Sequence, residues 1–341
     1  MKALNEKMRN AAMANEIATG NMRNTPLERK AHLEKLQLVE GKEIFAVQYT
    51  SIHKAAIDGS VDAMKHFLTG RGRKKGGTGS KVSCDDWDQC KMSPIHYAAE
   101  RGYDHVMEAI VDRGGDVNCK NGNGCTAMML CAKFGHHESV DKLYVMGGNL
   151  LAKSSGGMSI AHYAIQCDYV ECLKVLVKRF TEVLQLAMAR VEELELIALN
   201  GGDTAIGDIE DEIDKPVGTL NVEYFREALG LDENVTEEDV LAEALKMQPE
   251  DILDLPSLSG LRCAHMCGDF GSMKCLEYLI SLGVSMSNAD SVGETPLHKA
   301  GRKNFFEAYD VIKTATGPDG ERVQNLLRET PHGLLHDETL Y

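Results

Sequence analysis

Small and apolar residues recur along the chain as pairs of short helical patterns separated by glycines. Between positions 93 and 118, Gly102 ends a first helical pattern and a second follows it with apolar residues at core spacing. Gly114 and Gly115 break the second pattern, and Asn-Gly-Asn-Gly at 121–124 predicts a tight turn. The apolar residues of the second pattern are Val106, Met107, Ile110 and Val111. The segment therefore predicts two helices followed by a hairpin.

This unit returns at a fixed interval. His96, Met129 and His162 hold equivalent places 33 residues apart, and His265 and His298 are again 33 apart. The phrase Ser-Pro-Ile-His-Tyr-Ala-Ala at 93–99 recurs in altered form at 126–132 and 159–165, and 295–298 reads Thr-Pro-Leu-His. This chain resembles the ankyrin-repeat family, whose units carry a Thr-Pro-Leu-His-x-Ala signature at this period. The resemblance implies an all-α solenoid of helix–turn–helix units with β-hairpin fingers, and such solenoids usually bind proteins.

Six repeats can be aligned, four within 48–180 and two within 258–317. His53 precedes His96 by 43 residues, so the first finger carries about ten extra residues. These extra residues predict a mobile, glycine-rich basic loop over 69–83. Its cations are Arg71, Arg73, Lys74, Lys75 and Lys81. We expect residues 1–47 to form a helical cap and 318–341 a tail that contains the stub of a seventh repeat.

A longer interruption separates the fourth repeat from the fifth, because His162 and His265 are 103 residues apart. The stretch 181–199 has no glycine or proline, so the second helix of repeat four should continue through it. An acidic loop at 201–218 and two helices at 221–229 and 236–247 complete a predicted insertion over 181–257. Asp168 and Phe180 stand where the repeat has glycine, which questions normal stacking here. We nevertheless expect one continuous solenoid from which the insertion projects.

The net charge of −15 comes from one segment of the chain. Positions 181–258 contain 21 acidic and four basic residues, whereas the rest of the chain is close to neutral. The acidic insertion is either a solubilising face or a grip for a basic surface.

The cysteines follow the repeat pattern. Cys131 and Cys267 take the core alanine place, and Cys172 and Cys275 share one place in the second helix. Small buried thiols of this kind indicate a reducing compartment rather than disulfides. No run of about 18 apolar residues predicts a membrane span. The sequence therefore predicts an intracellular, cytoplasmic protein, with a cytoskeletal or organelle-associated assembly left open.

The resemblance also implies a binding surface, made of the finger tips and the exposed faces of the first helices. Trp87 is the only tryptophan, and it lies on a finger tip where an aromatic anchor would contact a partner. The alternative for Trp87 is packing back onto the basic loop. The partner-binding positions carried over by alignment are Trp87, Asp88, Lys120, Asn121, Asn123 and Asp290 on the fingers, and Tyr97, Arg101, Leu130, Phe134, Tyr163, Phe270, Lys299 and Arg302 on the first helices.

Other chemistry finds little support. The resemblance implies that the recurring histidines bond to the adjacent repeat, and the spacing of Cys119, Cys125 and Cys131 is too wide for paired zinc ligands. The loop at 232–243 lacks the glycine of a calcium loop, and the basic loop matches no phosphate-binding motif. We therefore expect no catalytic residue, metal site or cofactor, and no enzyme.

Three functions remain as hypotheses. The first is a protein-binding adaptor, as a structural or accessory subunit of a larger assembly. The second is a regulatory subunit that inhibits or recruits an enzyme through the insertion or the basic loop. The third, a nucleic-acid or nucleotide binder, is disfavoured because the basic loop has no aromatic residue for base stacking. The basic loop could also meet an acidic surface.

Overall fold

The computed structural model describes residues 51–68, 85–199 and 220–335. The regular secondary structure in these ranges consists of helices joined by turns and loops. Each repeat has a short inner helix and an outer helix. The inner helices are α4 (Ile52–Ile57), α6 (Pro94–Arg101), α8 (Ala127–Lys133), α10 (Ile160–Ile165), α14 (Cys263–Phe270), α16 (Pro296–Lys303) and α18 (Pro331–Leu334). The outer helices are α5 (Val61–Leu68), α7 (Asp104–Val111), α9 (His137–Val145), α11 (Val170–Leu199), α15 (Met273–Ser281) and α17 (Phe306–Thr316). A short 3-10 helix, η2 (Gly320–Arg322), follows α17.

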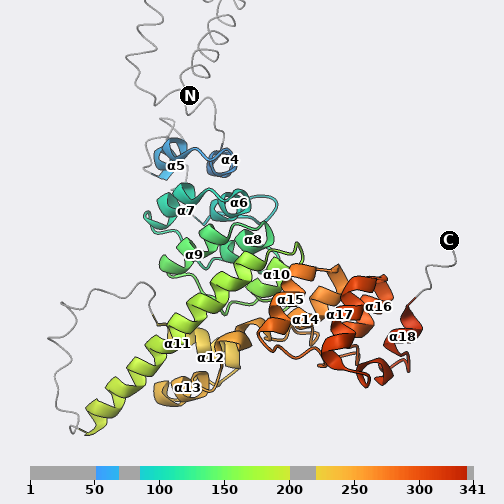
Figure 1. Ribbon diagram of the computed structural model, residues 1–341. Coiled ribbons are helices and arrows are strands. Elements are labelled where there is room, and N and C mark those ends of the chain that lie inside the picture. The colour runs from blue at the N-terminus through green and yellow to red at the C-terminus, as the bar shows by residue number, and fades with distance from the viewer. Residues whose placement is uncertain (1–50, 69–84, 200–219, 336–341) are drawn as a thin grey trace, which may run out of the picture.

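The pairs stack into one all-α ankyrin solenoid, as the sequence predicts. Figure 1 shows the stack running from α4 and α5 at the N-terminal end to α10 and then continuing through α14 to α18. No strand occurs in the described residues, so the fingers are closed turns rather than the β-hairpins that the resemblance implies. The predicted cap at 1–47, the basic loop at 69–83 and the acidic loop at 201–218 lie outside the described residues.

The signature residues start and end the inner helices. Ser93 is extended and its backbone N–H donates to Nδ1 of His96 at 3.2 Å, while Pro94 takes the first helical position. Gly102 ends α6 with φ of 66°, and a Cβ there would lie 2.8 Å from the ring of His136. Glycine is thus required both for the left-handed turn and for the close approach of the next repeat.

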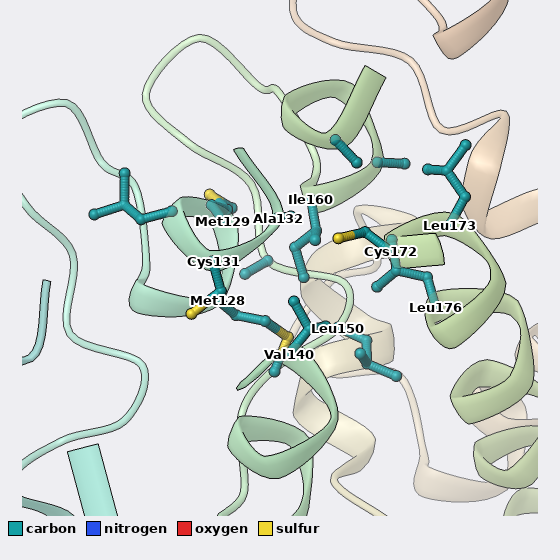
Figure 2. Packing of buried hydrophobic residues seen from close by; sticks show 14 of the residues in the cluster. Met128, Met129, Cys131, Ala132, Val140, Leu150, Ile160, Cys172, Leu173 and Leu176 are labelled. Atoms are coloured by element: carbon teal, nitrogen blue, oxygen red, sulfur yellow. The ribbon is translucent and has the colours of Figure 1, made fainter. Parts of the chain in front are cut away.

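The core lies between successive helix pairs. Figure 2 shows this packing where repeats three and four meet, with Met129 and Val140 of repeat three on one side and Ile160 and Leu176 of repeat four on the other. Cys131 and Cys172 are fully buried in the same layer, and burial raises the pKa of both thiols. These cysteines therefore act as small apolar side chains, as the repeat pattern indicates.

The recurring histidine ties each repeat to the next. Because Nδ1 accepts a backbone N–H, the neutral ring carries its proton on Nε2 and donates to the following repeat. His96 donates to the carbonyl of Cys125 at 3.0 Å, and His265 donates to that of Glu294 at 3.0 Å. His298 reaches Glu329 at 3.2 Å, immediately before α18, so the same bond joins repeat six to the segment that follows it. This confirms the structural role that the resemblance implies.

The same bond crosses the insertion. His162 of repeat four donates to the carbonyl of Leu261 in repeat five at 3.0 Å, and α10 packs against α14. Asp168, which departs from the glycine pattern, adopts φ of 58° and accepts a hydrogen bond from the backbone N–H of Cys275 at 2.9 Å. It therefore caps the N-terminus of α15 from the preceding repeat. The departure strengthens the stacking that the sequence analysis questioned, and the solenoid is continuous.

The insertion packs along the projecting part of α11. It contains α12 (Val222–Leu229), α13 (Glu237–Ala244) and the 3-10 helix η1 (Pro249–Leu253). Phe180, the second departure from glycine, is fully buried and its ring centroid lies 6.2 Å from that of Phe225 on α12. The hydroxyl of Tyr224 accepts a hydrogen bond from Asn118 at 2.9 Å, which joins the insertion to repeat two. Figure 1 shows α12 and α13 beside α11.

Candidate partner-binding surface

Every finger between repeats is closed by one recurring backbone hydrogen bond. In the second finger, for example, the N–H of Asn121 donates to the carbonyl of Cys125 at 2.9 Å. The same donor and acceptor places recur in the pairs Asp88–Met92, Ser154–Met158, Ser257–Leu261, Asp290–Glu294 and Asn325–Glu329. Neighbouring tips are also joined, as where the N–H of Gly122 donates to Lys91 at 2.9 Å. The finger tips therefore form a row in fixed register along one side of the solenoid.

Three of the finger residues predicted to contact a partner accept hydrogen bonds that hold the turn of their finger. Asp88 Oδ1 accepts the N–H groups of Cys90 at 2.8 Å and Met92 at 3.0 Å. Asn121 Oδ1 accepts two N–H groups in the same way and the residue is 6% exposed, while Asp290 Oδ1 accepts those of Val292 and Glu294. Their oxygens thus shape the finger tips.

The residue after the signature histidine links the inner helix to its finger. The hydroxyl of Tyr97 donates to Asp88 Oδ2 at 2.6 Å, and Lys299 Nζ bonds Asp290 at 2.9 Å in the equivalent place. Burial opposes ionisation of Asp88, but the bonds from Tyr97 and the two backbone N–H groups outweigh it and lower its pKa. Burial, with the charge on Asp88, raises the pKa of Tyr97. Tyr97 is therefore a neutral donor that fixes the first finger.

Trp87 stands at the rim of a groove. Its side chain is 56% exposed, and the groove, which is wide open to solvent, has a volume of about 680 Å³ between the first finger and α4. The lining residues are Ser51, His53, Lys54, Ile57, Trp87, Asp88 and Gln89. The ring of His53 meets Tyr97 edge-on, with centroids 6.2 Å apart, so the floor is fixed while Trp87 faces solvent. We call this feature the Trp87 groove.

The remaining predicted contacts fall into two groups. Arg101, Lys120 and Asn123 are exposed, and Phe134 and Phe270 are 44% and 43% exposed. By contrast, Leu130 is 6% exposed, and the half-buried Tyr163 places its hydroxyl 3.1 Å from Cys125 Sγ. Only the first group has side chains that are exposed enough for a partner to reach.

At the C-terminal end, Lys299 and Arg302 are held in ion pairs. Glu294 is 6% exposed and contacts both cations, and Arg302 also reaches Glu329 at 3.1 Å. Burial opposes ionisation of Glu294, but the two cations prevail and lower its pKa. These charges hold repeat six and the last finger together, so a partner would have to compete for them.

Sequence reasoning missed a row of apolar finger tips after the insertion. Leu258, Val292, Leu326 and Leu327 are 79%, 44%, 73% and 67% exposed. Each lies one or two places after the turn residue of its finger, at 257, 290 or 325, and that spacing was the available signal.

The other candidate sites can be placed briefly. The basic-loop cations Arg71, Arg73, Lys74, Lys75 and Lys81 lie outside the described residues. Cys125 and Cys131 are buried and Cys119 half-buried, and the described ranges contain no group of three or more His, Cys, Asp or Glu side chains that could hold a metal. No helix in the described part is long and apolar enough to span a membrane.

Comparisons with known proteins agree with the repeat architecture. The family model for ankyrin repeats (3 copies) matches residues 95–185. The human ASB11 ankyrin repeat domain superposes with a TM-score of 0.50 at 17% identity, covering 84% of this chain and 92% of that domain. This likeness concerns the fold alone.

Curated relatives carry names that point beyond the fold. The chain is 26% identical over 196 residues to the probable E3 ubiquitin-protein ligase XBOS33 of Oryza sativa subsp. japonica, which covers 57% of this chain and 32% of the relative. It is 30% identical over 89 residues to the E3 ubiquitin-protein ligase XBAT33 of Arabidopsis thaliana, covering 26% of this chain and 17% of the relative. The chain thus spans a third or less of the length of these relatives.

These names correct one expectation. The sequence analysis expected no enzyme, because it found no catalytic motif, but the relatives are named as ligases. The expectation failed because a repeat scaffold carries binding surfaces whose pattern is silent about the reaction they serve. The repeats themselves imply protein–protein interaction. The stacked helix pairs, the histidine bonds between repeats, the family match over residues 95–185 and the structural likeness agree, and this chain contains ankyrin repeats stacked in the ankyrin-repeat fold.

Proposed function

We propose that the chain binds a partner protein along the finger tips and inner helices of repeats one to four, as a recognition subunit of a larger assembly. The single observation that carries this proposal is the Trp87 groove. A tryptophan that is 56% exposed at the rim of an open groove, above a fixed floor, has the properties of an interface anchor. Tyr97 and Asp88 hold the finger that carries it, so little ordering is needed on binding.

The experiment is capture of partners from native lysate by the full-length chain and a matched pair of variants. The surface variant is Trp87→Ala, Arg101→Ala, Lys120→Ala, which spares Tyr97 because that residue holds the finger. The control variant is Val145→Ala, Lys178→Ala, Met188→Ala, which changes exposed side chains on the outer helices. We expect the surface variant alone to lose the partners. Equal capture by all three proteins would contradict the proposal.

A second candidate, target recognition in ubiquitin transfer, is favoured by the names of the relatives. In this case the captured protein is the one that becomes modified. We expect ubiquitin conjugates of that protein to fall in cells that express the surface variant in place of the wild type. If its conjugates are unchanged while its binding is lost, the chain recruits it for another purpose, such as regulation of an enzyme.

A further inference from the structure

One helix of the insertion reaches the base of two fingers. α12 rests on α11 of repeat four, where the ring of Phe225 packs against that of Phe180. Its Tyr224, one position earlier, bonds to Asn118 in repeat two. In a simple solenoid each repeat contacts only its neighbours. α12 therefore links repeat two to repeat four across the repeat between them.

Asn118 is held by three hydrogen bonds at this point. Its Nδ2 donates to the hydroxyl of Tyr224 at 2.9 Å and to the carbonyl of Gly147 at 3.0 Å, and its Oδ1 accepts the N–H of Asn149 at 2.7 Å. The Tyr224 hydroxyl in turn donates to the same Gly147 carbonyl at 3.3 Å. The donors of both side chains are thus satisfied, and a closed network of this kind fixes the positions of its members.

These contacts lie where the second and third fingers begin. Asn118 precedes the turn residue of the second finger, Asn121, by three places. Asn149 begins the segment that leads to the third finger, in which Lys153 Nζ lies 3.5 Å from the carbonyl of Ala228 on α12. Since both fingers belong to the proposed binding face, α12 joins the insertion to that face.

The seam between α12 and repeat three is not fully packed. It contains a cavity of about 30 Å³ between Tyr144, Phe180 and Phe225, large enough to hold a water molecule. The hydroxyl of Tyr144 is buried and has no hydrogen-bond partner among the described residues. A seam with a gap and an unbonded hydroxyl opens more readily than the close-packed core between repeats. Docking of α12 is therefore suited to reversible change.

We infer that α12 is a brace for the second and third fingers. While α12 is docked, Tyr224 holds Asn118 and the two fingers keep their position; when α12 leaves, they loosen. Control of partner binding by this brace rests on the function proposed above, because looser fingers lower affinity only if the partner binds there. The brace itself is a property of the free chain.

The test measures how fast N-ethylmaleimide labels Cys119 in the full-length chain, followed by peptide mass spectrometry. Cys119 is half-buried beside Asn118, and burial raises the pKa of its thiol to about 11, so it reacts slowly while the finger is held. Cys90, which is exposed on the first finger, is the internal standard. We expect Tyr224→Phe to speed labelling of Cys119 about fivefold and Phe225→Ala by about tenfold or more, with Cys90 unchanged.

Two substitutions in repeat six are matched controls. Tyr309→Phe also removes a hydroxyl that bonds a side chain, here Glu321 at 3.2 Å, and Ile312→Ala also leaves a cavity under an outer helix. Both should leave labelling of Cys119 within about twofold of the wild type. Equal labelling in the wild type and all variants, or equal acceleration by the controls, would overturn the brace.

Partner capture separates this inference from the proposed function. We expect a partner whose capture depends on Trp87 to bind Phe225→Ala about fivefold or more weakly than it binds Ile312→Ala. Equal binding of such a partner to both variants would overturn control of binding by α12 and leave the proposed function intact. If no captured protein depends on Trp87, the proposed function fails, and labelling of Cys119 still decides whether α12 braces the fingers.

Discussion

The carboxylate of Asp168 accepts the backbone N–H of Cys275 at 2.9 Å, and the two residues are separated by 107 positions that contain the whole insertion. Asp168 also lies 3.3 Å from the N–H of Lys274. One side chain in a place usually held by glycine thus joins repeat four to the outer helix of repeat five. The proposed binding face before the insertion and the repeats after it are therefore parts of one stacked body.

Removing this cap should loosen the junction. Asp168→Ala loses the two acceptor contacts and keeps a left-handed residue that alanine tolerates less well than aspartate, so we expect a loss of about 1–2 kcal/mol in the free energy of unfolding. Asp168→Asn keeps an acceptor oxygen and the tolerance for this backbone, and it should lose much less. Urea unfolding measures both variants, and equal stability of Asp168→Ala and wild type would contradict the capping role.

The histidine bonds should make the solenoid sensitive to acid. Burial lowers the pKa of His162 to about 4, against about 6.5 for an unfolded histidine, because the charged ring loses its solvation in the core. The neutral ring is also the form in which Nδ1 accepts a backbone N–H. The unfolded chain therefore binds the proton first, and this contribution, on the order of 3 kcal/mol, is present above pH 6.5 and lost as the pH falls toward 4. Thermal unfolding between pH 7.5 and 4.5 should show the decline.

Repeat three supplies the control, since Met129 stands in the histidine place. We expect His162→Met to be less stable than wild type at pH 7.5 but to lose less stability on acidification. The same loss of stability in both proteins between pH 6.5 and 4.5 would show that other groups, such as the carboxylates, set the acid response.

The insertion should depend on one aromatic contact. Phe225 is 1% exposed against Phe180, so Phe225→Ala leaves a cavity and should weaken docking of α12 by about 3–5 kcal/mol. Tyr224→Phe loses only its hydrogen bonds, at a cost near 1 kcal/mol. Amide hydrogen exchange over 222–253 should therefore quicken far more in Phe225→Ala than in Tyr224→Phe. Unchanged exchange in Phe225→Ala would contradict this account of the insertion.

The second finger should depend on Asn121 although that side chain is buried. Asn121→Ala removes the acceptor for two backbone N–H groups and should cost about 1–2 kcal/mol, while Asn121→Asp keeps that oxygen and should cost less. Binding of a partner should weaken in the alanine variant because the tip that carries Lys120 and Asn123 loses its shape. Normal stability and binding in Asn121→Ala would show that the turn forms without this side chain.

Much of this fold could be predicted from periodicity, because a 33-residue interval fixes which side chains face the neighbouring repeat. The burial of Cys131 follows from it directly, whereas the role of His96 follows from the resemblance to the ankyrin-repeat family. The role of Asp168 could not be predicted in this way, since its partner amide lies beyond an insertion of unknown path. A residue other than glycine at this position shows only that some interaction of its own side chain must stabilise the turn.

The binding face was harder to predict, for a physical reason. Alignment places Asp88, Asn121 and Asp290 on finger tips, but it does not separate a side chain that meets a partner from one that bonds its own backbone. Asn121 is followed by glycine and Asp290 by serine, which is typical of such turns, so the signal was present in the sequence for two of the three. Exposure of Leu258 and Leu326 depends on how the tips turn outward, and in the sequence only their spacing after the turn residue indicates it.

The most direct test of the central claim is amide hydrogen exchange of the full-length chain with and without a captured partner. The account predicts slower exchange at the finger tips and inner helices within 87–101 and 120–134, with the outer helices α7 and α9 unchanged. Protection confined to the outer helices, or to α11, α12 and α13, would contradict it, because the partner would then bind away from the Trp87 groove.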